Sequence, residues 1–251
     1  MTDSIRARSL SEILDGTFKL YRDHAGVLLA ISVPSGLVTG LSSFLIHHGK
    51  EFDASKFLGI LLPLFFLGAF AYISQLGALF AATTDAYLGR PFSIGSAYAR
   101  SFSRFGALCW ALFLFGVGCG VGLILLVVPG IYLALRWALW TPALMVEEIG
   151  GVESLSRSAK LVQGSMGRLS LLLLAFTILQ FAIDRGLSAA LPSALAEIPW
   201  FGAAAATLPA ILLAPLYPAL ITIFYFDGRI RHEAFDLELR AQALPAAVTP
   251  P

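Results

Sequence analysis

Arg136 is the residue best placed to do chemistry, because it interrupts an otherwise apolar stretch. Residues 105–135 contain no Asp, Glu, Lys or Arg, and Trp137 and Trp140 follow Arg136. A charge near the centre of a membrane span costs at least about 2.5 kcal/mol, so it normally faces a partner, water or the interface. A guanidinium also binds phosphate through paired hydrogen bonds. Three roles remain open: snorkelling to the interface, pairing with a carboxylate such as Asp184, and holding an anionic substrate or lipid phosphate.

Three more cations extend this candidate contact. Arg157, Lys160 and Arg168 lie between two apolar stretches. Basic clusters beside a membrane attract anionic headgroups, although such clusters are common and need not recognise any one lipid. We therefore predict that Arg136, Arg157, Lys160 and Arg168 are the contacts for an anion or a lipid headgroup.

Acidic residues recur where apolar stretches end, and a glycine follows each within a few residues. These residues are Asp85, Glu147, Glu148 and Asp227. Their recurrence predicts a repeated structural joint, with Arg100, Arg157 or Arg229 as the partner from another repeat. Paired carboxylates also serve in acid–base catalysis, but the sequence places no nucleophile or metal ligand beside them.

His47 and His48 form the remaining polar cluster, together with Glu51 and Asp53. Such a loop could bind a metal ion, but adjacent histidines diverge in direction on regular structure, which favours a solvated loop. The chain has no H-E-x-x-H, P-loop or G-x-S-x-G pattern. We expect no enzyme activity, no cofactor and no metal.

The composition indicates a membrane protein. Hydrophobic residues make up 57% of the 251 residues and charged residues 13%, and the mean hydropathy is +0.80. Soluble domains carry about 25% charged residues. About 20 apolar residues span the hydrocarbon core as a helix. The charge-poor stretches predict six membrane helices at about residues 25–46, 57–86, 105–128, 131–147, 168–190 and 202–226.

Pro129 and Gly130 divide the longest of these stretches, and the sequence predicts the turn between the third and fourth spans at this pair. A β-barrel is the other structure that satisfies its backbone in lipid. Barrel strands alternate polar and apolar residues. Segments such as 171–174 and 122–126 do not alternate, so the predicted class is all-α.

Three short amphipathic stretches, each with an apolar and a polar face, precede apolar stretches. This recurrence predicts three repeats. Each repeat would be a cytoplasmic amphipathic helix followed by a transmembrane hairpin, at about residues 9–88, 92–149 and 151–228. An exit helix at 229–241 and a disordered tail at 242–251 would complete a single membrane domain of residues 1–241. The apolar stripes begin Leu10, Ile13, Leu14 in the first repeat, Ile94, Ala97, Tyr98 in the second and Val152, Leu155, Ala159 in the third. Such helices lie in the membrane interface or pack against the ends of the spans.

The basic residues predict the orientation. Of the 17 Lys and Arg residues, 13 lie before the first span, after the last, or in the two connections that follow even-numbered spans. The positive-inside rule then places both termini in the cytoplasm.

Four segments carry a resemblance to known proteins, namely residues 14–22, 128–137, 154–164 and 224–238. They resemble the bacterial family of the glycerophosphodiester phosphodiesterase membrane domain and related inner-membrane proteins, and the likeness extends over residues 8–240. Gly228 and His232 depart from it, because Leu and Lys are expected there. The resemblance implies a multi-pass protein of the bacterial inner membrane. Some members carry a fused phosphodiesterase domain, which we expect this chain to lack.

Three functions follow from these patterns. The first is a non-enzymatic scaffold or lipid-handling module of the bacterial envelope. The second is a small carrier for an anionic lipid or metabolite, with Arg136 as its ligand. The third, suggested by the family resemblance, is a membrane-embedded enzyme acting on phosphodiesters. The predicted partners are the lipid bilayer, anionic headgroups, and a protein partner or a second copy of the chain. A net charge of +1 gives no argument for nucleic acid.

Overall fold

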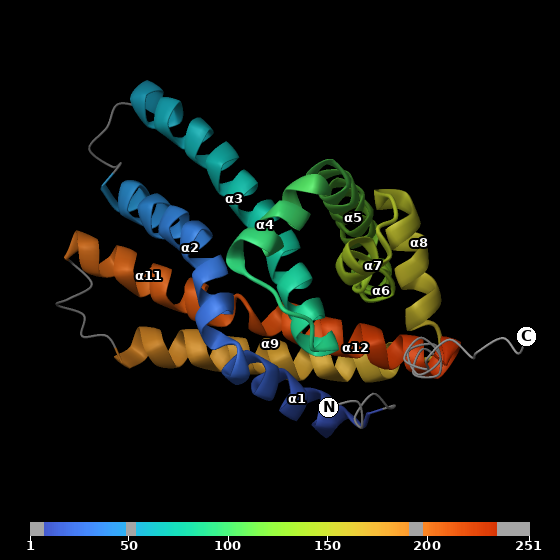
Figure 1. Ribbon diagram of the computed structural model, residues 1–251. Coiled ribbons are helices and arrows are strands. Elements are labelled where there is room, and N and C mark those ends of the chain that lie inside the picture. Colours follow the sequence, from blue (N-terminus) through green and yellow to red (C-terminus); the bar gives the residue numbers. More distant parts are fainter. Residues whose placement is uncertain (1–7, 49–53, 191–197, 235–251) are drawn as a thin grey trace, which may run out of the picture.

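The computed structural model describes residues 8–48, 54–190 and 198–234 (Figure 1). Within these ranges the chain is helical and contains no strand. The helices are α1 Leu10–Asp23, α2 Ala25–His48, α3 Ala54–Leu88, α4 Ile94–Ser103, α5 Phe105–Leu125, α6 Val127–Arg136, α7 Trp140–Glu147, α8 Gly151–Val162, α9 Met166–Ala190, α11 Pro199–Leu213 and α12 Leu216–Glu233. The predicted all-α class is confirmed for this part of the chain.

Six helical segments of the described chain are long and apolar enough to cross a membrane. They are Ala25–Ile46, Gly59–Leu88, Phe105–Leu125, Val127–Glu147, Met166–Ile183 and Ala203–Glu233. Each overlaps one span predicted from the sequence. The protein is therefore a multi-pass membrane protein by the length and composition of its helices.

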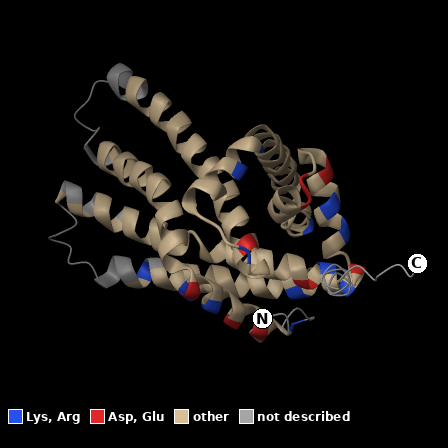
Figure 2. Cartoon of the chain, viewed as in Figure 1, with Lys and Arg blue, Asp and Glu red and all other residues tan. Residues whose placement is uncertain are grey.

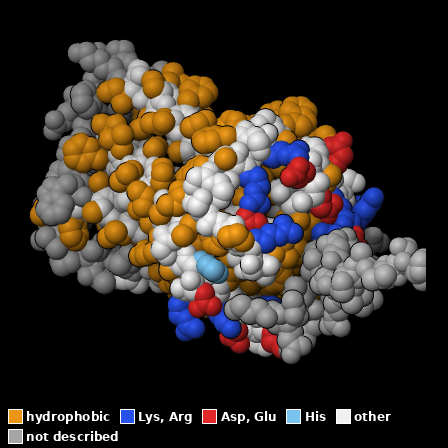
Figure 3. All heavy atoms as spheres, viewed as in Figure 1, with side chains coloured by type: hydrophobic (Ala, Val, Ile, Leu, Met, Phe, Trp, Pro, Cys, Tyr) orange, Lys and Arg blue, Asp and Glu red, His pale blue; other side chains and the backbone are white. Residues whose placement is uncertain are grey.

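The surface of these segments is apolar. Large side chains such as Phe65, Ile124 and Leu174 are more than half exposed. Figure 3 shows hydrophobic side chains over most of one side of the molecule, with charged side chains gathered at the other. In Figure 2 most charged residues lie around α1, α4, α8 and the end of α12, and Arg185 lies toward the end of α9, whereas α2 and α11 have none. Such separation suits a protein with an apolar belt in lipid and one strongly charged end.

The turn between α5 and α6 lies at Leu126, three residues before the predicted position. Leu126 is extended, at φ −161° and ψ 139°, and α6 begins at Val127. Pro129 and Gly130 therefore lie in the first turn of α6, so the predicted break at this pair is wrong. Proline is tolerated in a first helical turn because the amide it lacks would have no intrahelical partner there.

Glycines bring α5 and α6 into contact. A Cβ added to Gly122 would lie 2.9 Å from the Gly130 Cα, and one added to Gly118 would overlap the Trp137 ring. Gly116 and Gly120, on the opposite face of α5, have no atom within 4 Å of such a Cβ. Close helix packing, which the sequence predicts for these glycines, therefore concerns one face of α5.

The fourth and sixth spans are each interrupted. Residues 137–139 form a turn that separates α6 from α7, and Ala214 and Pro215 separate α11 from α12. Pro215 lacks the amide hydrogen that would continue the helical ladder, which explains the second break. α12 then runs to Glu233, so residues 229–233 of the predicted exit helix continue this span. Ala234 is left-handed at φ 52° and ends the helix, so the predicted continuation is wrong at this residue, and residues 235–241 and the tail at 242–251 lie outside the described residues.

The second, fourth and sixth spans form the core. α3 packs against both α7 and α12, and these three helices contribute half of the largest fully buried side chains. A hydrogen bond of 2.9 Å joins the hydroxyls of Thr83 on α3 and Thr222 on α12, both fully buried. This bond fixes the position of one span against the other without exposing a polar group to lipid.

Short helices α1, α4 and α8 pack against this core. Ser9 and Glu12 form a capping box at the start of α1, as their spacing predicts. In α8 the buried face differs from the predicted stripe: Val152 is 55% exposed, whereas Ser154 and Ser158 are fully buried. Hydrophobicity alone could not identify this face, because serine hydroxyls that bond to neighbouring backbone occupy it.

Candidate anion-binding pocket

Arg136 and Lys160 line one pocket, between α6 and α8. Its volume is about 340 Å³, and its other lining residues are Leu133, Trp137, Ser156, Ala159 and Gln163. No acidic side chain lines it among the described residues. We call this the Arg136–Lys160 pocket. The pocket is suited to an anion that also accepts hydrogen bonds, because two cations, a hydroxyl and an amide surround it.

Arg136 ends α6 and is exposed rather than buried within the bundle. Its guanidinium donates a 2.9 Å hydrogen bond to the hydroxyl of Tyr132, one turn earlier, and lies 5.8 Å from the centre of that ring. No ion pair joins Arg136 to a carboxylate of the described residues. The side chain of Asp184, the partner considered from the sequence, lies outside the described part of the chain.

Lys160 reaches the pocket from α8. It is exposed and has no hydrogen bond or ion pair to another described residue. Neither cation of the pocket therefore has its charge neutralised by a described acidic side chain. An anion placed between them would gain Coulomb energy from both.

Ser158 fixes the distance between the two helices that carry these cations. Its hydroxyl donates to the Arg136 carbonyl at 3.0 Å and accepts from the Leu139 amide at 2.9 Å. It therefore satisfies two backbone groups at the turn after α6, where helical bonding is interrupted.

Replacing Ser158 by Ala is expected to destabilise the protein by about 1–3 kcal/mol, because the buried Leu139 amide would lose its acceptor. Unfolding in mixed detergent micelles, followed by circular dichroism, measures the change. Ser156→Ala on the exposed side of α8 is the matched control, with an expected change below about 0.5 kcal/mol. Equal stability of the two variants would contradict this role of Ser158.

Arg157, three residues before Lys160, is instead held by carboxylates. Its Nε donates to both oxygens of Glu147 at 2.7 and 2.8 Å, and its Nη2 donates to Glu233 at 2.7 Å. Tyr225 also donates to Glu147, at 2.6 Å. Hydrogen bonds raise the pKa of Arg157 above its ordinary value, the one to Glu233 more than the one to Glu147. Burial lowers this pKa but does not outweigh them. With its charge already compensated, Arg157 lies outside the pocket.

Arg168, the fourth predicted contact, is also paired. It donates to Asp227 at 3.0 Å, as does Arg231 at 2.8 Å, and the other Asp227 oxygen accepts from the Arg8 amide at 2.7 Å. Arg168 and Arg231 both donate to the Arg8 carbonyl. This Asp227 cluster joins α9, α12 and the segment before α1 around one buried carboxylate.

The other acidic joints follow the same scheme. Asp85, at the end of α3, pairs with Arg100 of α4. Glu148 adopts the left-handed conformation after α7, at φ 54°, and pairs with Arg104. Arg229, one of the three partners considered, pairs with Glu233. Each of the joint acids thus pairs with an arginine.

The described residues hold no group of three or more His, Cys, Asp or Glu side chains that could bind a metal ion. The cluster around His47 and His48 lies outside the residues whose side chains are described. Sequence reasoning missed Gln163, which lines the pocket, and Tyr132, which bonds to Arg136 without being part of the lining. The four-residue spacing from Tyr132 to Arg136 would have indicated their contact on a helix.

The structure thus brings two of the four predicted cations together and places the other two in ion pairs.

Comparisons with protein-family models, with curated proteins and with solved structures found no match to this chain.

Proposed function

We propose that this protein is a non-enzymatic lipid-handling module of the bacterial inner membrane, and that it binds an anionic headgroup in the Arg136–Lys160 pocket. The observation that carries the proposal is the uncompensated charge of that pocket. Arg157 and Arg168 have carboxylate partners, whereas Arg136 and Lys160 have none among the described residues. A phosphate group supplies both the charge and the acceptor oxygens.

The proposed architecture is three repeats, each an amphipathic helix followed by a membrane hairpin. Two parallel joints support it: Asp85 at the end of α3 pairs with Arg100, and Glu147 at the end of α7 pairs with Arg157. Arg100 and Arg157 occupy the same position, the seventh, of α4 and α8. The eighth position is a buried hydroxyl residue in all three short helices: Thr17, Ser101 and Ser158.

In this proposal the charged end faces the cytoplasm, with both termini on that side. The excess of Lys and Arg in the connections supports it. Exposed apolar residues on the short helices, namely Phe18, Phe102 and Val152, would then lie in the interface. Association with a second copy of the chain or with another protein stays a prediction, as does the resemblance to the glycerophosphodiester phosphodiesterase membrane domain.

The test is binding of a fluorescent phosphatidylglycerol to the purified full-length protein in neutral micelles. The double variant Arg136→Gln, Lys160→Gln is expected to bind at least about tenfold more weakly, a loss of about 1.4 kcal/mol. Wild type and the double variant should bind phosphatidylcholine, whose headgroup has no net charge, with similar affinity.

Arg22→Gln, Arg90→Gln is the matched control. It removes the same net charge from two exposed arginines outside the pocket. A loss as large as that of the pocket variant would assign the binding to general electrostatic attraction and would contradict the proposal.

A further inference from the structure

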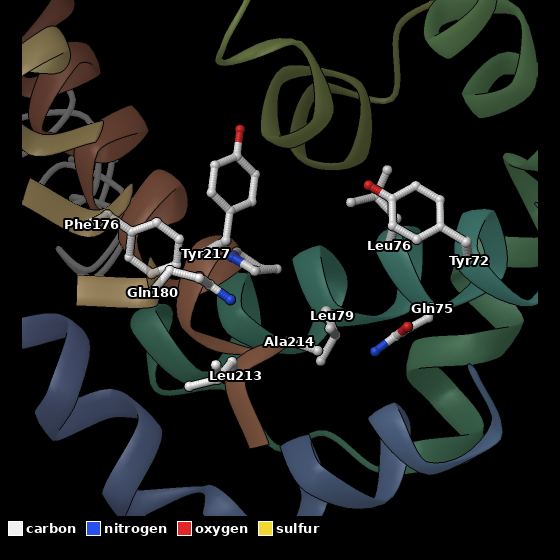
Figure 4. A pocket seen from close by; sticks show the side chains of 10 residues that line it. Tyr72, Gln75, Leu76, Leu79, Phe176, Gln180, Leu213, Ala214 and Tyr217 are labelled. Carbon is white, nitrogen blue, oxygen red and sulfur yellow. The ribbon is translucent and has the colours of Figure 1, made fainter. Parts of the chain in front are cut away.

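A second cavity lies among the membrane spans, away from the Arg136–Lys160 pocket. Its volume is about 370 Å³, and α3, α9, α11 and α12 line it beside the break at Ala214 and Pro215 (Figure 4). The walls are apolar and aromatic apart from two side-chain amides and two tyrosines. Cavities of this size accept small organic molecules.

Gln75 of α3 is the most unusual residue of the lining. Its side chain is only 6% exposed, and its Oε1 accepts a hydrogen bond from the Ser35 hydroxyl. Its Nε2 is buried and has no hydrogen-bond partner. A buried donor without an acceptor destabilises the folded state, so native structures rarely keep one without a reason.

Gln180 of α9 lies across the cavity from Gln75. In Figure 4 Gln180 lies beside Phe176 and Tyr217 on one side of the cavity, and Gln75 lies on the other side, beyond Leu79 and Ala214. Gln180 also has no hydrogen bond to another described residue. Two donors from different spans therefore face one space, and Tyr72, Phe176 and Tyr217 supply flat walls around it.

The depth of the cavity restricts what could enter. Gln75 precedes Asp85 by ten residues on α3, and Tyr217 precedes Asp227 by ten on α12, about 15 Å along each helix. Half the hydrocarbon core of a bilayer is also about 15 Å. With the acidic joints at the interface, the cavity lies near the middle of the membrane, where a charged headgroup is strongly disfavoured.

We propose that this cavity binds the carbonyl group of an uncharged, membrane-dissolved molecule, with the amides of Gln75 and Gln180 as hydrogen-bond donors. Isoprenoid quinones and diacylglycerols both present such carbonyls within a membrane. The ligand oxygen would satisfy the buried Nε2, and the aromatic walls would contact the apolar remainder. This site is independent of the anionic headgroup proposed for the other pocket.

Equilibrium binding to the full-length protein in micelles tests the proposal with two probes, decylubiquinone and dioleoylglycerol. At least one is expected to bind, and Gln75→Leu is expected to weaken it about tenfold through the lost hydrogen bond. Binding of the quinone alone would identify a planar ring as the ligand, and binding of the glyceride alone an ester. Decylbenzene, which has no oxygen, should bind wild type and variant equally.

Stability distinguishes a ligand contact from a structural one. Without ligand, Gln75→Leu should melt no lower than wild type, because it removes an unpaired donor while Ser35 keeps its bond to the Ser32 carbonyl. Thr177→Val, on the exposed face of α9, is the control and should leave probe binding unchanged. Failure of both probes to bind, or equal affinity of wild type and Gln75→Leu for them, would overturn the proposal.

Discussion

Replacing Asp227 by Ala is expected to destabilise the protein by about 3 kcal/mol. The carboxylate is buried and bonds to Arg168, to Arg231 and to the Arg8 amide. Its removal leaves two neighbouring guanidinium groups without their anion and one amide without its acceptor. Unfolding by sodium dodecyl sulfate in mixed micelles, followed by circular dichroism, measures this change.

Asp15→Ala is the matched control, since Asp15 is exposed on α1 and has no ion pair to another described residue. Its expected effect is below about 0.5 kcal/mol. Asp227→Asn should fall between the two, because the amide keeps the shape and an acceptor oxygen but loses the charge. A loss of less than about 1 kcal/mol for Asp227→Ala would mean that the arginines are stabilised by water instead.

Gly122→Val is expected to destabilise the contact between α5 and α6 by about 3 kcal/mol. The added Cβ would lie 2.9 and 3.0 Å from the Cα and amide nitrogen of Gly130. These are backbone atoms, so the clash can be relieved only by moving α6 as a whole. Because α6 ends at Arg136, the variant should also weaken binding at the Arg136–Lys160 pocket.

Gly120→Val provides the comparison on the same helix, since a Cβ there meets no atom within 4 Å. It carries the same change in helix propensity and in side-chain volume. Thermal unfolding in detergent should place it near wild type, well above Gly122→Val. Similar melting of both variants would show that the glycines act through helix flexibility rather than through packing.

The spans could be predicted from the sequence because the physics behind them is local. A stretch without charges that is long enough to cross a bilayer is visible in the chain itself. The turn at Leu126 was missed for the opposite reason. Leucine gives no turn signal, and the position of the turn depends on how Gly122 and Gly130 fit together.

The pocket could be predicted only in part. The four cations were identified by type, but their partners depend on which helix lies opposite. Arg157 and Lys160 are three residues apart on α8, yet one meets Glu147 and Glu233 while the other faces α6. Sequence spacing shows on which face of a helix a residue lies, but not which other element packs against that face. The unpaired amide of Gln75 likewise becomes visible only when its surroundings are known.

The Asp227 cluster has a consequence for the order of biosynthesis. Arg8 leaves the ribosome more than two hundred residues before Asp227 and Arg231, the residues that later hold it. The segment before α1 therefore cannot form its contacts with α12 until that helix has been synthesised. Closure between Arg8 and α12 is therefore a late event in the assembly of the fold.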